Sequence, residues 1–102
     1  MIHAEISIYP VSAPTTSASF YIAKAIESIR DIDCLRYEVN SMGTVLESDS
    51  IGTIYVAAER MMETVHNLGI DRAEVVIKVD SRRDKDVSME EKLDSIKRHL
   101  ER

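Results

Sequence analysis

Residues 35–47, LRYEVNSMGTVLE, decide the fold of this chain, because they read as two strands joined by a tight turn. Side chains alternate along the first strand, so that Tyr37 and Val39 face one side and the residues between them face the other. Gly43 suits the turn because a positive φ costs glycine little, and 44–47 then returns as the partner strand. The segment therefore predicts a β-hairpin around this glycine.

A strand and a helix are expected before this hairpin. Residues 2–9, IHAEISIY, alternate apolar and polar side chains at the period of a half-buried strand. The hydroxyl residues within 15–19 favour a helix start, because they accept hydrogen bonds from the first free N–H groups, and this helix should fade at 31–33. Its expected apolar face consists of Phe20, Ile22, Ile26 and Ile29.

A helix and a strand are also expected after the hairpin. Ser48, Asp49 or Ser50 can cap a helix that Gly69 ends, and residues 73–79 alternate as a further strand. The apolar stripe expected for this helix is Ile51, Ile54, Ala58, Met61, Val65 and Leu68.

A third helix follows a charged loop at 81–86. Ser88 and Glu91 have the spacing of a capping box, and the helix should cover about 88–101 with the apolar stripe Met89, Leu93, Ile96 and Leu100.

The order of elements is typical of a ferredoxin-like α+β sandwich, a βαββαβ unit with an antiparallel four-stranded sheet. We expect both core helices on one face, the first and third strands in the centre, the unit at about 2–80, and one domain over 1–102.

Composition excludes several classes of protein. The 102 residues carry a formal net charge of −5, which argues against a sequence-independent nucleic-acid binder. A single cysteine excludes an intrachain disulfide and favours a reducing compartment, so we expect a cytoplasmic protein. No apolar run approaches the ~20 residues needed to span a bilayer. Seven of the 13 basic residues lie within 81–102, which suggests either a solvated helix or a local anion or subunit contact.

One face of the expected sheet has no helix to cover it. This face could be exposed to solvent, form a polar subunit interface or form the floor of a ligand-binding site. The third helix could lie over the sheet edge or pack on another subunit. The residues assigned to this face are His3, Glu5, Ser7, Tyr9, Arg36, Glu38, Asn40, Val76, Lys78 and Asp80.

No catalytic motif is found, and the three histidines are too scattered for a metal site, so neither an enzyme nor a metalloprotein is expected. Three local groups remain as candidates. Residues 15–19 could hold an anion or a polar ring edge, or simply cap a helix. Residues 42–44 could let a backbone approach a partner closely, or simply turn. Residues 78–85 could bind an anion, or be a solvated charge run.

Four segments in this order resemble the YkoF-like thiamine-binding family. They are ISIYPV at 6–11, the hydroxyl-rich stretch 15–19, YEVNSMGTVLE at 37–47 and IKVDSRRDK at 77–85, and the resemblance extends over about 2–100. It implies a ferredoxin-like subunit that assembles as a homodimer or a dimer of dimers. It also implies binding of thiamine or its hydroxymethylpyrimidine portion, without a known reaction, for carriage, sequestration or supply. We expect no required cofactor and, from the composition, neither a nucleic-acid partner nor a membrane.

The resemblance and the chemistry of thiamine together suggest a set of ligand residues. The edge of the pyrimidine could form hydrogen bonds with several polar groups. These are the hydroxyls of Thr15, Ser17 or Thr44, the Asn40 side chain and the backbone near Gly43. An aromatic ring or a carboxylate would favour the cationic thiazolium. The candidates for that role are Tyr9, Tyr37, Glu38 and Asp80.

The basic run Arg82, Arg83 and Lys85 would repel the thiazolium and suits a phosphate, a sulfate or an acidic group across a subunit boundary. Two alternatives to a thiamine-binding protein remain open. One is a structural or regulatory oligomeric module that binds another protein or a small anion such as phosphate or sulfate. The other is a small enzyme whose active site is shared between subunits.

Overall fold

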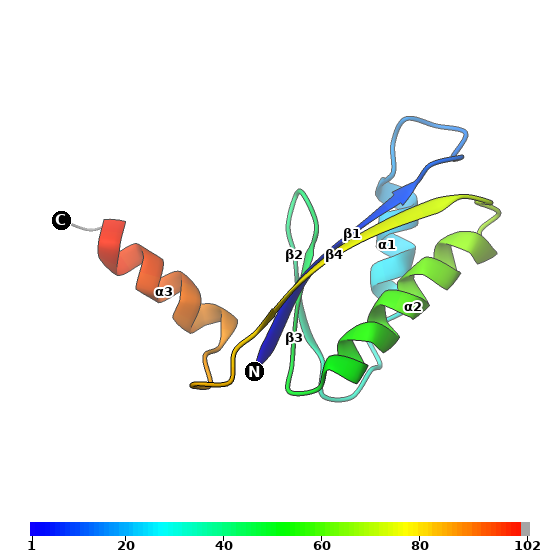
Figure 1. Cartoon of the computed structure of the whole chain (residues 1–102). Coiled ribbons are helices and arrows are strands. Elements are labelled where there is room, and N and C mark those ends of the chain that lie inside the picture. Colours follow the sequence, from blue (N-terminus) through cyan, green and yellow to red (C-terminus); the bar gives the residue numbers. More distant parts are fainter. Residues whose placement is uncertain (101–102) are drawn as a thin grey trace.

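The computed structural model describes residues 1–100, which form four strands and three helices (Figure 1). The elements are β1 (Ile2–Pro10), α1 (Ser19–Glu27), β2 (Arg36–Val39), β3 (Thr44–Ser48), α2 (Ile51–Asn67), β4 (Ala73–Ser81) and α3 (Met89–Leu100). The sheet has the order β2-β3-β1-β4, and all its pairs are antiparallel. The expected ferredoxin-like α+β sandwich, with β1 and β3 in the centre, is confirmed.

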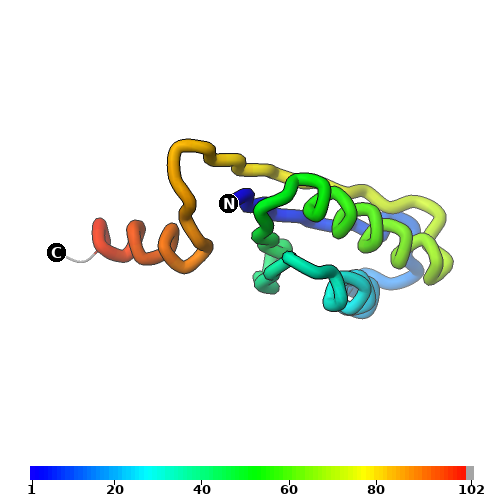
Figure 2. The backbone as a smooth tube through the Cα atoms, turned by 90° about the horizontal axis from the view of Figure 1, so that it is seen from below, coloured from blue at the N-terminus to red at the C-terminus, as the bar shows by residue number. Residues whose placement is uncertain are grey.

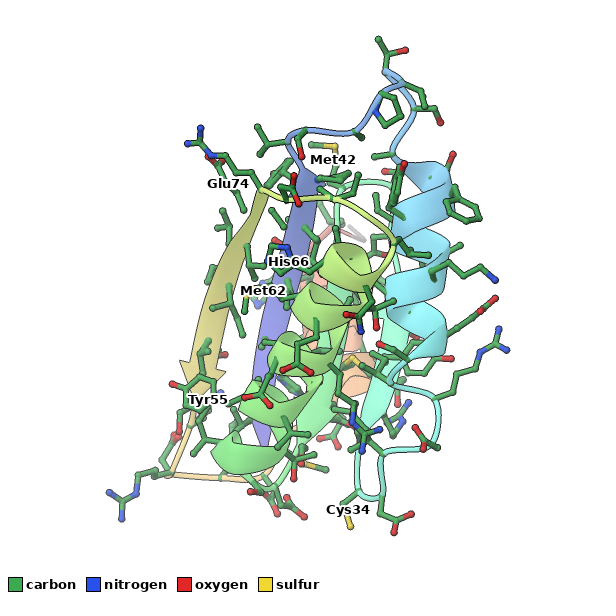
Figure 3. The ribbon with its side chains drawn as sticks, turned by 90° about the vertical axis from the view of Figure 1, so that its right-hand side faces the viewer. Cys34, Met42, Tyr55, Met62, His66 and Glu74 are labelled. Atoms are coloured by element: carbon green, nitrogen blue, oxygen red, sulfur yellow. The ribbon has the colours of Figure 1, made fainter. Side chains whose placement is uncertain are left out.

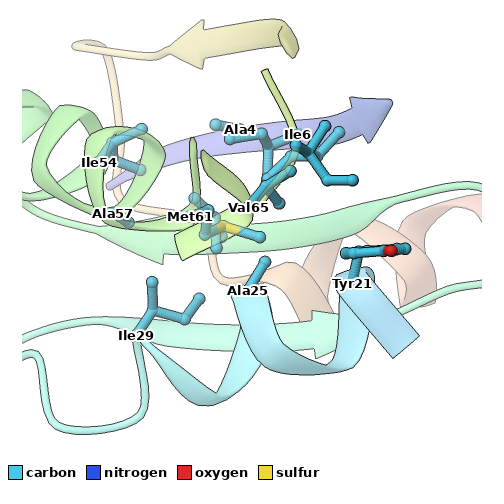
Figure 4. Close-up of a cluster of buried hydrophobic side chains, with 12 residues drawn as sticks. Ala4, Ile6, Tyr21, Ala25, Ile29, Ile54, Ala57, Met61 and Val65 are labelled. Atoms are coloured by element: carbon cyan, nitrogen blue, oxygen red, sulfur yellow. The ribbon is translucent and has the colours of Figure 1, made fainter. Parts of the chain in front are cut away.

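The core lies between the sheet and the two helices α1 and α2 (Figure 4). Strand β1 alternates as expected, so that Ala4, Ile6 and Ile8 are buried against the helices. Helix α2 begins at the N-cap Ser50, whose hydroxyl accepts a hydrogen bond from the N–H of Thr53 at 3.4 Å. The core residues of α2 are Ile54, Ala57, Met61 and Val65, so the ends of its expected stripe, Ile51 and Leu68, are exposed instead.

The face of α1 that enters the core agrees only in part with the sequence-based prediction, since Ile29 is buried and Ile26 packs against the core as expected. Tyr21, Ala25 and Ile29 are buried, whereas Phe20 is 57% exposed and lies under the Lys24 ammonium. Six of the nine residues of α1 are apolar or aromatic, so periodicity alone leaves the direction of the buried face ambiguous. The expected hydroxyl cap is also wrong, because Ala18 is the N-cap and makes no side-chain hydrogen bond.

Helix α3 leaves the sandwich (Figure 2). Its first residue, Met89, is buried, whereas Leu93, Ile96 and Leu100 of the expected stripe are exposed. The capping box is present, since the Glu91 N–H donates to the Ser88 hydroxyl at 3.1 Å. The expected end of this helix, at 101, lies outside the described residues. Within residues 1–100, no helix has the length and apolar character needed to cross a membrane.

Candidate functional site

A cavity of about 230 Å³ opens at the end of the core where the β2–β3 hairpin meets the second half of β1. We call it the hairpin pocket. Its walls are mainly apolar, and polar groups from β1 and the hairpin lie at its edge. The apolar lining comes from Ile6, Ile8, Ala18, Ile22, Ala25, Val39, Met42 and Met61, and the remainder from Ser7, Tyr9, Asn40, Ser41, Gly43 and Thr44.

The turn of the hairpin is closed by one internal hydrogen bond and is held against β1 by a second hydrogen bond and a close approach. The Asn40 N–H donates to the Gly43 carbonyl at 2.8 Å, and the Ser7 hydroxyl donates to the Met42 carbonyl at 3.0 Å. Figure 3 shows Met42 at this end of the sheet. A Cβ at Gly43 would lie 3.0 Å from the Ser7 Oγ and 3.1 Å from the Ile6 carbonyl oxygen. The glycine is therefore required for a close approach to β1 of the same chain, and not for the positive φ that the sequence suggested, which Gly43 does not adopt.

Thr44 and Asn40 give the hairpin pocket its polar character. Thr44 stands opposite Ile6 in the β1–β3 pair, so its side chain points to the helix side of the sheet. It is 3% exposed. Asn40 follows the end of β2 and contributes to the rim. A hydroxyl and an amide beside an apolar wall can orient a flat polar ring by hydrogen bonds to its edge.

A buried carboxylate on the opposite face of the sheet was missed by the sequence reasoning. Glu47 is 2% exposed. Its Oε1 accepts hydrogen bonds from His3 Nε2 and from the Met89 N–H, both at 2.9 Å, and its Oε2 accepts one from Arg36 Nη1 at 2.7 Å. Arg36 also contacts Glu90 at 3.0 Å. The start of α3 is thereby tied to three strands.

The electrostatics of Glu47 follow from these contacts. Burial by itself raises its pKa, but the hydrogen bonds from His3 and Met89 and the charge of Arg36 outweigh burial and hold the pKa below its ordinary value. The strand register contains a signal that could have found this cluster. Glu47 stands opposite His3 in the β1–β3 pair and opposite Arg36 in the β2–β3 pair.

A second cavity, of about 400 Å³, lies between α3 and the open sheet face, and we call it the α3 groove. Two of the predicted thiamine carboxylates, Glu38 and Asp80, line it. The Asp80 carboxylate accepts a hydrogen bond from the Lys92 ammonium at 2.6 Å, which holds the pKa of Asp80 below its ordinary value. Asp80 is therefore already paired with a cation of its own chain.

The basic run lies at the other end of the sheet from the hairpin pocket. Arg82 makes two hydrogen bonds to Asp84, at 2.6 and 3.0 Å. Arg82 and Lys85, but not Arg83, line a shallow depression of about 430 Å³ beside α3. The run follows Ser81, which pairs with Ile2 at the start of β1, whereas the pocket borders the end of β1. A single chain does not bring the run and the pocket together.

The predicted ligand residues thus fall into separate groups. The hairpin pocket brings together Tyr9, Asn40, Gly43 and Thr44, and Asn40 also lines the α3 groove. Tyr37 instead packs against the hydrophobic core. Thr15 and Ser17 line neither cavity. The Thr15 hydroxyl instead accepts a hydrogen bond from the Ser17 N–H, and the Ser17 hydroxyl bonds to that of Ser19.

Two residues that line the hairpin pocket, Ile22 and Met61, were assigned from the sequence to apolar helix faces. Periodicity does not distinguish a pocket wall from a core position.

No group of three or more potential metal ligands is present among residues 1–100. His66 hydrogen-bonds to the Ile70 carbonyl through Nδ1 at 2.8 Å, a structural role that suits the end of α2.

A ferredoxin-like chain with an apolar pocket edged by a hydroxyl and an amide falls in the class of small-molecule-binding proteins. A family model described as "Thiamine-binding protein" matches residues 4–97, and the chain belongs to this family. A UPF0045 protein of Methanothermobacter thermautotrophicus is 35% identical over 100 residues, which cover 98% of this chain and all of the relative. A UPF0045 protein of Methanocaldococcus jannaschii is 42% identical over 93 residues, with 91% and 89% covered.

Solved structures agree with this assignment. The crystal structure of a hypothetical protein from Methanocaldococcus jannaschii superposes with a TM-score of 0.85 at 41% identity and covers 94% of this chain and 95% of its own. A Thermotoga maritima protein, described as a candidate thiamine biosynthesis/salvage protein, superposes with a TM-score of 0.75 over 93% of this chain and 97% of its own. At 18% identity, that second likeness supports the fold alone.

Proposed function

We propose that the hairpin pocket binds the pyrimidine ring of thiamine, or free hydroxymethylpyrimidine, without catalysing a reaction. The observation that carries the proposal is the juxtaposition, in a member of the thiamine-binding family, of an apolar slot with the Thr44 hydroxyl and the Asn40 amide. An aminopyrimidine presents a flat apolar face and an edge with both a donor and an acceptor. The slot and the two polar side chains are complementary to these features.

The size of the cavity supports binding of one ring rather than of the whole vitamin. Its volume of about 230 Å³ lies below the ~300–1,000 Å³ of pockets that enclose a drug-sized ligand. The thiazolium would then lie at the mouth, where the half-exposed ring of Tyr9 offers an aromatic face to a cation. The chain carries 18 acidic and 13 basic residues, a balance that favours a cationic ligand.

The protein would act as a self-associating cytoplasmic subunit, residues 1–102 forming one ferredoxin-like unit that carries, sequesters or supplies the vitamin. Support for self-association comes from α3, whose side chains Leu93, Ile96 and Leu100 expose an apolar stripe. A stripe of this kind suits contact between two dimers. Support for a role without catalysis comes from the sequence, which has none of the common catalytic motifs.

Calorimetry with thiamine on the purified, ligand-stripped chain tests the proposal. Thr44→Val keeps the volume and deletes the hydroxyl, so we expect the affinity to fall about 5- to 30-fold, as one lost hydrogen bond of ~1–2 kcal/mol requires. The matched control is Thr15→Val, which removes a hydroxyl outside the pocket and should leave the affinity unchanged. The absence of heat with the oligomer intact, at high micromolar protein, would refute thiamine binding and favour the alternative module that binds a protein or a small anion.

A further inference from the structure

Helix α1 begins without a cap. Its N-cap residue is Ala18, whose side chain cannot accept a hydrogen bond. The amides of residues 19–21 therefore have no hydrogen-bond acceptor among residues 1–100. A helix start normally recruits a serine, threonine, aspartate or asparagine for these donors. Helix α2 shows this usual arrangement, because the Ser50 hydroxyl accepts from the Thr53 N–H at 3.4 Å.

Hydroxyl groups near the start of α1 are close enough in sequence to cap it, but they bond to one another. Thr15 Oγ1 accepts from the Ser17 N–H at 2.9 Å, and the Ser17 and Ser19 hydroxyls share a hydrogen bond of 2.8 Å. The loop thus contains the residue types that cap helices and does not use them for that purpose. A local rule of stability that is broken in this way is expected at a functional site.

The start of α1 borders the hairpin pocket. Ala18 and Ile22, which are one helical turn apart, line this pocket together with Ala25. Figure 3 shows the start of the helix at the same end of the sheet as Met42. The N–H groups of a first helical turn are directed past the N-terminus of the helix. They can therefore donate to a ligand that fills the pocket and reaches the start of α1.

A second unsatisfied group faces the same pocket. Thr44 is 3% exposed, and its hydroxyl has no hydrogen-bond partner among the described residues. No side-chain oxygen or nitrogen of these residues is both sealed from solvent and without a partner. The Thr44 hydroxyl is therefore accessible through the pocket that it lines. A nearly buried polar group without a partner costs free energy, and a ligand that hydrogen-bonds to it removes this cost.

The charges around the pocket favour an uncharged acceptor. Among residues 1–100, none of those that line the pocket carries a formal charge. Two basic side chains on adjoining segments are already paired with acids, since Lys24 contacts Glu27 at 3.5 Å and Arg72 contacts Glu74 at 3.6 Å. A phosphate carries about −1.5 to −2 charges at pH 7 and is bound in proteins by arginine or lysine. A ring nitrogen needs no such cation.

We propose that the bound pyrimidine completes α1 as its missing N-cap. A ring nitrogen accepts hydrogen bonds from the amides of Phe20 and Tyr21, the two positions that an N-cap side chain normally serves. The Thr44 hydroxyl bonds to another atom of the ring edge. The proposal rests on the proposed function and names the backbone groups that orient the ligand. Binding and the stability of α1 are then coupled, because the first turn has an acceptor only when the ligand is present.

Hydrogen exchange on the free and the ligand-saturated chain tests the cap. The probe is free hydroxymethylpyrimidine, which lacks the thiazolium charge. Without ligand the amides of Phe20 and Tyr21 should exchange almost as in an unstructured chain, and saturation should slow them about tenfold more than the Thr53 amide. Thr53 is the internal control, because Ser50 already caps it and its rate reports only general stabilisation by the ligand. Protection of Phe20 and Tyr21 before ligand is added would overturn the proposal, as would the absence of slowing at saturation.

Two substitutions at the N-cap separate capping from bulk. Ala18→Asp supplies a carboxylate to the free amides, so it should raise the melting temperature of the free chain by about 4–8 °C. The matched control Ala18→Val adds bulk without an acceptor and should not raise it. Because the aspartate already satisfies the amides, Ala18→Asp should bind hydroxymethylpyrimidine about tenfold more weakly than Ala18→Val. Equal affinities of the two variants would overturn the proposal.

Calorimetry with hydroxymethylpyrimidine and thiamine separates this inference from the proposed function. A ligand that binds the wild type, weakens in Thr44→Val and leaves the amides of Phe20 and Tyr21 unprotected overturns the cap alone and leaves the proposed function in place. A wild-type chain that produces no heat with either compound overturns both. Circular dichroism confirms that the variants are folded, as expected for changes at the partly exposed position 18.

Discussion

Replacing Glu47 by alanine should release the start of α3 from the sheet and lower the free energy of unfolding of the whole chain. An ionised carboxylate only accepts hydrogen bonds, so His3 Nε2 and the Met89 N–H both donate to it, each at 2.9 Å. Glu47→Ala leaves these two buried donors without an acceptor, at ~1–3 kcal/mol each. The expected loss is about 4 kcal/mol, a large part of the ~5–15 kcal/mol of a small domain.

Urea denaturation followed by circular dichroism measures this loss. With a slope of ~1–3 kcal/mol per molar urea, the midpoint should fall by about 2 M. Hydrogen exchange adds a local readout, because the Met89 amide loses its acceptor and should exchange freely, whereas the amides of β1 and β3 should lose only the protection that the global loss of stability removes. Glu47→Gln retains one oxygen for the two buried donors, so its effect should be smaller than that of alanine.

The control is Glu38→Ala, which removes an exposed carboxylate from the neighbouring strand β2 and should change the free energy of unfolding by less than about 0.5 kcal/mol. A loss below about 1 kcal/mol for Glu47→Ala, together with unchanged exchange at Met89, would refute the role of Glu47 in holding α3.

Three further outcomes follow from the same structure. Because the pKa of Glu47 is lowered by folding, its stabilisation is complete above the ordinary value of 4.5 and is lost as the pH falls through the folded value. Urea titrations at several pH values should therefore show a larger loss of stability in acid for the wild type than for Glu47→Gln, in which Asp80 still contributes. Gly43→Ala forces a Cβ to within 3.1 Å of the Ile6 carbonyl, so thermal melts should show destabilisation, whereas Gly52→Ala in α2, with its nearest contact at 3.5 Å, should stabilise by up to ~1 kcal/mol. Leu93→Asp places a charge in the exposed apolar stripe of α3, so sedimentation velocity should show a smaller assembly than that of the wild type, and an unchanged sedimentation profile would contradict a role of the stripe in assembly.

The order of the elements could be predicted from the sequence because each strand carries its own alternation. The hairpin at 35–47 and the glycine at its turn were sufficient to place a strand pair between two helices. The stop at Gly69 was equally local, and this residue has a φ of +95°. These features depend on a few neighbouring residues, which is why they could be read from the sequence.

The face of α1 and the burial of Glu47 could not be predicted in this way. Phe20 and Tyr21 are adjacent and both aromatic, and only the position of α1 on the sheet decides that Tyr21 enters the core. Glu47 is charged and stands on a face without a covering helix, so it is buried only because the start of α3 reaches it from 42 residues away. Both outcomes depend on tertiary contacts that periodicity does not contain.

The candidate site was predicted in part for the same reason. Asn40, Gly43 and Thr44 are close in sequence and remain close in the hairpin pocket. Asp80 and the basic run were grouped with them by chemistry alone, and the antiparallel pairing of β1 with β4 carries them to the other end of the sheet. Resemblance identified residue types, whereas the register determined which of them can meet.

The pairing of β1 with β4 also has a consequence for synthesis of the chain. β1 is made before the other three strands of this sheet, yet one of its two neighbours is complete only when Ser81 has been added, opposite Ile2. Until then β1 lacks one neighbour, and its side chains Ile6 and Ile8 lack part of the core. Such distant pairing raises the contact order, so folding should finish only after residue 81 has left the ribosome. A nascent chain stalled before β4 should therefore be the form most prone to aggregation.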